Sequence, residues 1–154
     1  MTYNIEMINV DPVFQSMCKR PYHNHPRGCP NYNHKAGCPP QQKLFFEVFD
    51  SDFYLIFNEF DLRNHVKRLK RKHPKWTERQ LYCCLHWQGG TRKSLTKLIN
   101  DFRSACPKHI VTLCPEGMGV DVTALMIDNA GIKLEWPPKY KAYQVAIAGL
   151  GRTK

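Results

Sequence analysis

Four cysteines have the residue type and the surroundings to do chemistry in this chain. Cys29 and Cys38 each follow a glycine and precede a proline, in GCP and GCPP, and Cys114 precedes a proline in LCPEGMG. Glycine lets the backbone approach a bound ion, and the following proline stiffens the loop and removes a backbone donor. Cys18 lies upstream in a C-x10-C-x8-C arrangement. We therefore expect these four thiols, Cys18, Cys29, Cys38 and Cys114, to bind a metal.

The segment around these cysteines supports this expectation. PYHNHPRGCPNYNHKAGCPP has almost no apolar side chains, so a hydrophobic core cannot hold it. No pair has the C-x2-C spacing of common zinc sites, so other ligands stay open. Cys106 and His34 are reserve ligands, and His23, His25 or His34 could replace Cys18 in a Cys3His site. Cys83 and Cys84, beside Leu81 and Leu85, are instead expected to be small buried side chains in a helix.

Two metal centres fit four thiolates. A closed set of four suits tetrahedral Zn²⁺, which would join the N-terminal loop to the strand that ends at Cys114. Four cysteines also suit a [4Fe–4S] cluster, and Cys-Pro is frequent in ferredoxin-type sites. Zinc is the favoured cofactor, and the cluster, with a redox or cluster-handling function, is the alternative.

The chain is strongly basic. Its 154 residues include 23 Lys and Arg against 13 Asp and Glu, a formal net charge of +10. Such an excess favours a polyanionic partner, RNA or DNA above all, although a merely solvated basic surface stays possible. Trp76, Tyr82 and Trp87 lie between the basic clusters and could stack on bases. The expected phosphate-binding residues are Arg63, Lys67, Arg68, Lys70, Arg71, Lys72, Arg92 and Lys93.

Signatures of familiar enzymes are absent from the sequence. There is no G-x-S-x-G, P-loop, G-x-G-x-x-G or H-E-x-x-H motif. A metalloenzyme of nucleobase or nucleoside modification stays an alternative, with Glu116 or Asp121 moving protons beside a metal. Both acidic residues also have a structural explanation, Glu116 in a turn and Asp121 as a helix cap.

The elements that must position these residues can be read from periodicity. LFFEVF and FYLIFNEF, separated by residues 50–52, predict a β-hairpin. Helices are expected from Asp61 to about His73, from a Thr77/Gln80 capping box to Gly89, from Thr91 onward, and from Asp121 to Gly131. HIVTLCP predicts a short buried strand, and AYQVAIAGL predicts the last strand.

This order of elements predicts an α+β fold with a small mixed or antiparallel sheet and about four helices. We expect a single domain over 1–154, with an irregular metal-binding segment at 1–43 and the α+β core at 44–154. No membrane span is expected, and the start of the chain does not have the pattern of a signal peptide, which favours a cytoplasmic protein.

Three segments resemble the DUF2284 family of predicted metal-binding proteins of bacteria and archaea. They are GCPNYNHKAGCPP, HWQGGTRKSL and LCPEGMGVDVTALMIDNAGIKLEWPPK, which together extend across most of the chain from Cys18 onward. The resemblance implies a bound metal and supports Cys29, Cys38 and Cys114 as its ligands, with Cys18 less firmly placed. It implies no particular activity.

Overall fold

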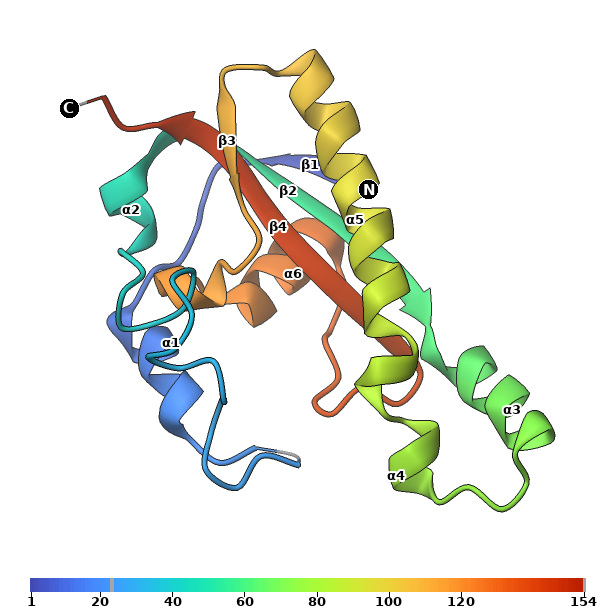
Figure 1. The fold of residues 1–154 in the computed structure, drawn as a ribbon. Helices are drawn as coiled ribbons and strands as arrows, with labels where there is room; N and C mark the ends of the chain where they lie inside the picture. Colours follow the sequence, from blue (N-terminus) through green and yellow to red (C-terminus); the bar gives the residue numbers. More distant parts are fainter. Residues whose placement is uncertain (23, 154) are drawn as a thin grey trace.

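A four-stranded antiparallel sheet forms the centre of the protein. In the computed structural model, which describes residues 1–22 and 24–153, the strands lie in the order β1-β2-β4-β3. They are β1 (Thr2–Ile5), β2 (Phe49–Asp61), β4 (Lys141–Gly151) and β3 (His109–Thr112). Each pairs antiparallel with its neighbour. The two long strands, β2 and β4, are central, and the two short strands form the edges (Figure 1).

Helices occupy both faces of this sheet (Figure 1). The α-helices are α1 (Pro12–Ser16), α2 (Phe45–Val48), α3 (Leu62–Lys72), α4 (Glu78–Leu81), α5 (Gln88–Ala105) and α6 (Val122–Ala130). Three short 3-10 helices are η1 (Met17–Lys19), η2 (Cys84–His86) and η3 (Glu116–Met118). Among the described residues, no helix is both long and apolar enough to cross a membrane.

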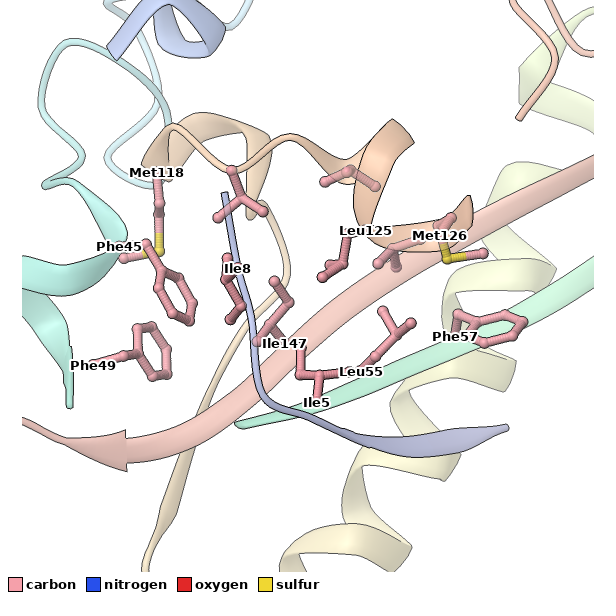
Figure 2. Close-up of a cluster of buried hydrophobic side chains, with 13 residues drawn as sticks. Ile5, Ile8, Phe45, Phe49, Leu55, Phe57, Met118, Leu125, Met126 and Ile147 are labelled. Atoms are coloured by element: carbon pink, nitrogen blue, oxygen red, sulfur yellow. The ribbon is translucent and has the colours of Figure 1, made fainter. Parts of the chain in front are cut away.

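The alternating side chains of β2 and β4 fill two hydrophobic layers. Leu55 and Ile147 point to one face, where they pack with Leu125 and Met126 of α6 (Figure 2). Ile56 and its neighbours in β4 point to the other face, beneath α5. Because side chains alternate along a strand, a sheet covered on both faces needs apolar residues at nearly every position of its central strands.

Several local predictions are confirmed. Asp61 accepts a hydrogen bond from the backbone N–H of Asn64 at the start of α3, and Thr77 forms the predicted capping box with Gln80. Asp121 accepts from Ala124 N–H at the start of α6, which ends at Gly131 in the left-handed conformation. The expected α+β class, with a small mixed or antiparallel sheet, is also confirmed, because the four strands pair antiparallel and helices pack on them.

The predicted hairpin is wrong. Residues 45–48 form α2, and residues 49–61 form a single strand that pairs with β1 and β4. The turn signals at 50–52 are absorbed as irregularities in the register of β2, with Asp52 at φ 53°. A bulge accommodates such residues without ending a strand.

Three further boundaries differ from the expectations. The helix expected to run to Gly89 ends at Leu81, and α5 begins at Gln88, so that Gly89 lies inside a helix. Strand β3 ends at Thr112, two residues before Cys114, and its edge position leaves it only partly buried. The N-terminal segment is not wholly irregular, because residues 2–5 form β1 and residues 12–16 form α1.

Candidate metal centre and basic surface

Cys18 and Cys29 are held side by side by the backbone. The N–H of Cys29 donates to the carbonyl oxygen of Cys18 at 2.8 Å. Gly28 lies between them with φ +82°, and a Cβ atom there would fall 2.7 Å from the same oxygen. Only glycine fits such a close approach at positive φ. The GCP motif thus lets this loop fold back against η1.

Cys38 and Cys114 meet through a second glycine. A Cβ atom at Gly117, in η3, would lie 2.9 Å from Cys114 Sγ and 3.4 Å from the carbonyl oxygen of Gly37. The turn that carries Cys114 therefore packs directly against the turn that carries Cys38. Gln15 of α1 fixes this arrangement, because its Nε2 donates to Gly117 O at 2.9 Å and to Gln42 O at 3.0 Å.

The thiols of the four predicted ligands interact electrostatically. Burial raises the pKa of Cys18, and the charges of Cys29, Cys38 and Glu116 raise it further. Burial and the charge of Glu116 raise the pKa of Cys114 to about 11, with smaller contributions from Cys38 and Cys18. Like charges raise one another's pKa only when they are near neighbours. These contributions indicate that the three cysteines of the N-terminal segment lie near Cys114, which is far along the chain.

The thiols are gathered but not closed around a common point. Within residues 1–22 and 24–153, no three His, Cys, Asp or Glu side chains are arranged so that they could hold a metal ion as they stand. A depression of about 600 Å³ opens beside Cys18 and Cys29, and His25 and His34 also line it. His34 is exposed on this rim. His23 lies outside the described residues.

The two acidic candidates differ in their surroundings. Asp121 caps α6, and its carboxylate is engaged there with Ala124 N–H at 3.0 Å, as its structural explanation requires. Glu116 reaches solvent, yet the protein around it desolvates its carboxyl and raises its pKa. Glu116 is also the acidic residue whose charge acts on Cys18 and Cys114. Of the two, only Glu116 belongs to the cysteine site.

The remaining cysteines lie elsewhere. Cys106 follows α5, whose C-terminal end is on the opposite side of the molecule from α1 (Figure 1). Cys83 is half-buried and Cys84 is exposed, so the expectation that both are buried in a helix is wrong. The helix ends before them, which leaves Cys84 at the start of η2. Burial, followed by Cys29, raises the pKa of Tyr22, and the charge of Cys84 adds the smallest contribution.

Helix α3 carries the densest positive charge. Leu62 and His65 are its buried residues, and the six basic residues predicted to bind phosphate there are exposed: Arg63, Lys67, Arg68, Lys70, Arg71 and Lys72. Arg92 and Lys93 are exposed in the first turns of α5. Among the Lys and Arg residues that the structure describes, only Lys141 forms an ion pair with a carboxylate. The positive charge is thus largely uncompensated.

The three aromatic residues predicted to stack on bases differ in how exposed they are. Trp87 is buried and stacks on Phe60 at 5.3 Å, so it belongs to the core. Trp76 is half-buried between His73 and His86, with ring centroids 4.0 and 5.2 Å away. Tyr82 is partly exposed. Trp87 is therefore not available to a base.

Sequence reasoning did not identify a groove at the start of α3. One wall carries Arg63 and Lys67 of α3. The other carries Tyr140, which precedes β4, and Lys141, the first residue of β4. The signal was present in the segment KLEWPPKYK, where lysines alternate with aromatic residues. Only the fold shows that this segment lies beside α3.

Comparison of the chain with protein-family models, with curated proteins and with solved structures finds no match. The resemblance to the DUF2284 family stays a prediction that rests on the three segments quoted above.

Proposed function

We propose that this protein is a cysteine-ligated metal protein that acts on or with nucleic acid, and that Cys18, Cys29, Cys38 and Cys114 hold its metal. The observation that carries the proposal is the convergence of these four thiols from two distant parts of the chain. Cys18 lies in η1, Cys29 and Cys38 come from the loop that follows η1, and Cys114 follows β3. A hydrophobic explanation fails here, because the loop residues between η1 and α2 are mostly exposed.

The donor set suits a thiophilic ion. Partly buried, neighbouring thiols are unfavourable when all are charged, which is why the pKa values of Cys18 and Cys114 rise. A bound cation reverses that preference, since it stabilises thiolates and releases their protons. The close packing at Gly28 holds the Cys29 loop against Cys18, and the close packing at Gly117 holds the Cys114 turn against the Cys38 turn.

Zinc is the favoured metal. It would supply a redox-inert cross-link between the loop and the α+β core. A [4Fe–4S] cluster would instead supply electron transfer. The chain's own residues have the same role in either case, in which the four cysteines bind the metal and Gln15 orients the two turns that carry Cys38 and Cys114.

Metal analysis with an absorption spectrum tests this proposal. Protein purified without oxygen is expected to contain about one zinc per chain and no visible colour. If the protein instead contains iron and absorbs broadly near 400 nm, the cofactor is the [4Fe–4S] cluster and not zinc. The protein would then be a redox or cluster-handling protein.

Cysteine variants identify the ligands. Cys38→Ser and Cys114→Ser are expected to lose the metal, whereas Cys83→Ser and Cys106→Ser are expected to retain it. The controls change the same atom at two thiols outside the proposed ligand set. Retention of a full metal complement by Cys114→Ser would contradict the proposed ligand set, and loss in Cys106→Ser would move the site elsewhere.

The uncompensated basic surface supports the nucleic-acid part of the proposal. Eight exposed cationic side chains on α3 and α5 favour a phosphate backbone as partner, and binding through phosphates is strongly salt-dependent. The absence of affinity for mixed RNA and DNA at low salt would contradict this part while leaving the metal centre intact.

A further inference from the structure

The groove at the start of α3 combines free positive charge with exposed aromatic surface. It has a volume of about 410 Å³ and lies between the first turns of α3 and the segment that enters β4. The backbone N–H of Arg63 donates to the carbonyl oxygen of Tyr140 at 2.9 Å, which fixes the two walls relative to each other. The groove is therefore a defined feature of the fold.

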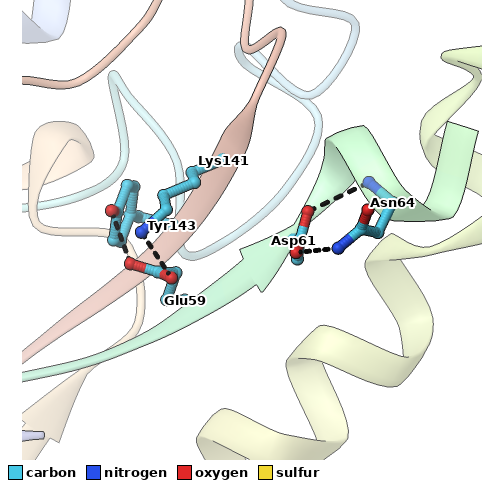
Figure 3. Close-up of polar contacts among 5 residues, drawn as sticks. All are labelled: Glu59, Asp61, Asn64, Lys141 and Tyr143. Atoms are coloured by element: carbon cyan, nitrogen blue, oxygen red, sulfur yellow. Dashed lines mark hydrogen bonds and ion pairs between the residues drawn. The ribbon is translucent and has the colours of Figure 1, made fainter.

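The charges in the groove are mostly available to an anion. Asp61, the one acidic residue among those that line it, is engaged in capping α3 through both of its oxygens, with Asn64 N at 3.0 Å and Asn64 Nδ2 at 2.6 Å (Figure 3). Lys141 is paired with Glu59 at 2.9 Å (Figure 3). Arg63 and Lys67 have no carboxylate partner among the residues that the structure describes. These two side chains are free to bind a phosphate.

The opposite wall presents one aromatic ring, that of Tyr140, and the loop leading to it carries a second, Trp136. The guanidinium of Arg63 lies over the ring of Tyr140, 5.6 Å from its centroid, and Tyr140 is 55% exposed. Trp136, four residues earlier in the same loop, is 72% exposed. Glu135 braces this loop, because its Oε2 accepts the N–H groups of Lys139 and Tyr140, each at 2.9 Å. The loop thus holds the exposed ring of Tyr140 at the groove, and the exposed ring of Trp136 belongs to the same braced loop.

We infer that this groove binds single-stranded nucleic acid, with Arg63 and Lys67 on the phosphates and with Tyr140 and Trp136 stacking on unpaired bases. The inference rests on the nucleic-acid function proposed above and names the form of its partner. Aromatic rings beside a cationic groove are the features with which proteins bind single strands, whose bases are free to stack. In a duplex the bases already stack on one another, so the rings would find no partner.

Fluorescence anisotropy with a labelled single-stranded RNA and its duplex, on full-length protein, tests the inference. Wild-type protein is expected to prefer the single strand. Tyr140→Ala and Trp136→Ala are each expected to weaken single-strand binding about tenfold and to leave duplex binding unchanged. Trp136→Phe, which keeps a stacking ring, should restore the affinity.

Charge variants provide an independent readout. Lys67→Ala is expected to lower the slope of log affinity against log salt concentration by about 0.7, the value for one phosphate of a single strand. Lys108→Ala, an exposed lysine between α5 and β3, is the matched control and should leave the slope unchanged.

The outcomes separate the two proposals. If wild-type protein binds neither RNA form at low salt, the nucleic-acid function itself is overturned. If it binds RNA but tolerates every groove variant, or loses affinity only in Tyr82→Ala, the groove inference alone is overturned and binding belongs to the α3–α4 surface. Displacement of the RNA by polyglutamate at equal charge concentration would assign the groove to an acidic peptide and overturn the inference as well.

Discussion

Gly117 packs directly against the sulfur of Cys114, one of the proposed metal ligands, and it can do so because it has no side chain. The pKa of the Cys114 thiol is raised to about 11, chiefly by burial, and the backbone of Gly117 offsets part of that rise. In Gly117→Ala the new methyl group would overlap Cys114 Sγ at 2.9 Å, so the thiol must move. We expect zinc affinity to fall about tenfold or more, the size of effect that residues supporting metal ligands have. Competition with a chromogenic chelator measures it.

A neighbouring glycine provides the control. Gly37 also lies in the cysteine loop, but a Cβ atom there would meet no atom of residues 1–22 and 24–153 within 4 Å. Gly37→Ala should therefore bind zinc as the wild type does. Equal affinities for both variants would show that the packing between the Cys114 turn and the Cys38 turn does not matter to the metal.

We expect His65 to make the stability of the protein depend on pH. Burial, followed by the charges of Arg68 and His86, lowers its pKa, and its buried Nε2 has no hydrogen-bond partner among the described residues. The unfolded chain, in which the pKa of histidine is about 6.5, then binds more protons than the folded chain. The free energy of unfolding is therefore expected to fall as the pH decreases through 6.5 and to level off below the folded pKa.

Urea denaturation at pH 7.5 and pH 5.5 measures this dependence. His65→Gln should reduce the difference between the two free energies of unfolding, whereas His34→Gln, on an exposed loop, should not. A difference that persists undiminished in His65→Gln would assign the pH dependence to other groups.

At the scale of single residues, the sequence predicts a cysteine site because its signal is local. Cys29 and Cys38 lie between glycine and proline in a loop with few apolar residues, and the fold places this loop against Cys18 and against the turn of Cys114. That these thiols bind a metal stays a prediction. The same reasoning misplaced Cys84, because whether a helix continues past Leu81 depends on packing that the pattern does not contain. It also missed Tyr140, because only the fold shows that this residue lies beside Arg63 in the groove.

Among the elements, α5 packs closely on the sheet because β4 presents small side chains to it. Ala146 and Ala148 are fully buried there, between Ile56 and the helix residues Leu95 and Ile99. Ala146→Leu would add volume where none is free, and such overpacking costs about 1–3 kcal/mol. We expect the free energy of unfolding from urea denaturation to fall by that amount.

An exposed alanine on the same helix tests whether the effect comes from packing. Ala105 is exposed at the C-terminal end of α5, so Ala105→Leu should leave the stability nearly unchanged. If Ala146→Leu also left the free energy of unfolding unchanged, close packing of α5 against β4 would be contradicted.

The elements that were predicted correctly are those with local boundary signals. The caps of α3 and α6 require only residues within one helical turn, and they lie where the sequence predicts them. The hairpin prediction was wrong because pairing between β2 and β4, whose partners lie at least eighty residues apart, outweighs the turn signals at 50–52. Propensity for a turn is weak compared with the burial of a central strand on both faces.

For the molecule as a whole, the strand order could not be read from the sequence. Strand β1 pairs with β2 across more than forty intervening residues, and nothing in its four residues specifies that partner. The charge distribution, in contrast, was predictable, because lysine and arginine side chains remain at the surface in nearly every fold. What the sequence does not contain is which loop lies against α3, and this decides where a ligand would bind.

The central position of β4 has a consequence for the order in which the protein can assemble during synthesis. β4 pairs with both β2 and β3, so the sheet cannot be completed until residues 141–151 have left the ribosome. Until then, a nascent chain has β1 and β2 available as one pair, while β3 has no neighbour to join. Since Cys114 follows β3, its thiol cannot be fixed against the N-terminal loop earlier than that moment. Completion of the metal site would thus mark the end of folding rather than its beginning.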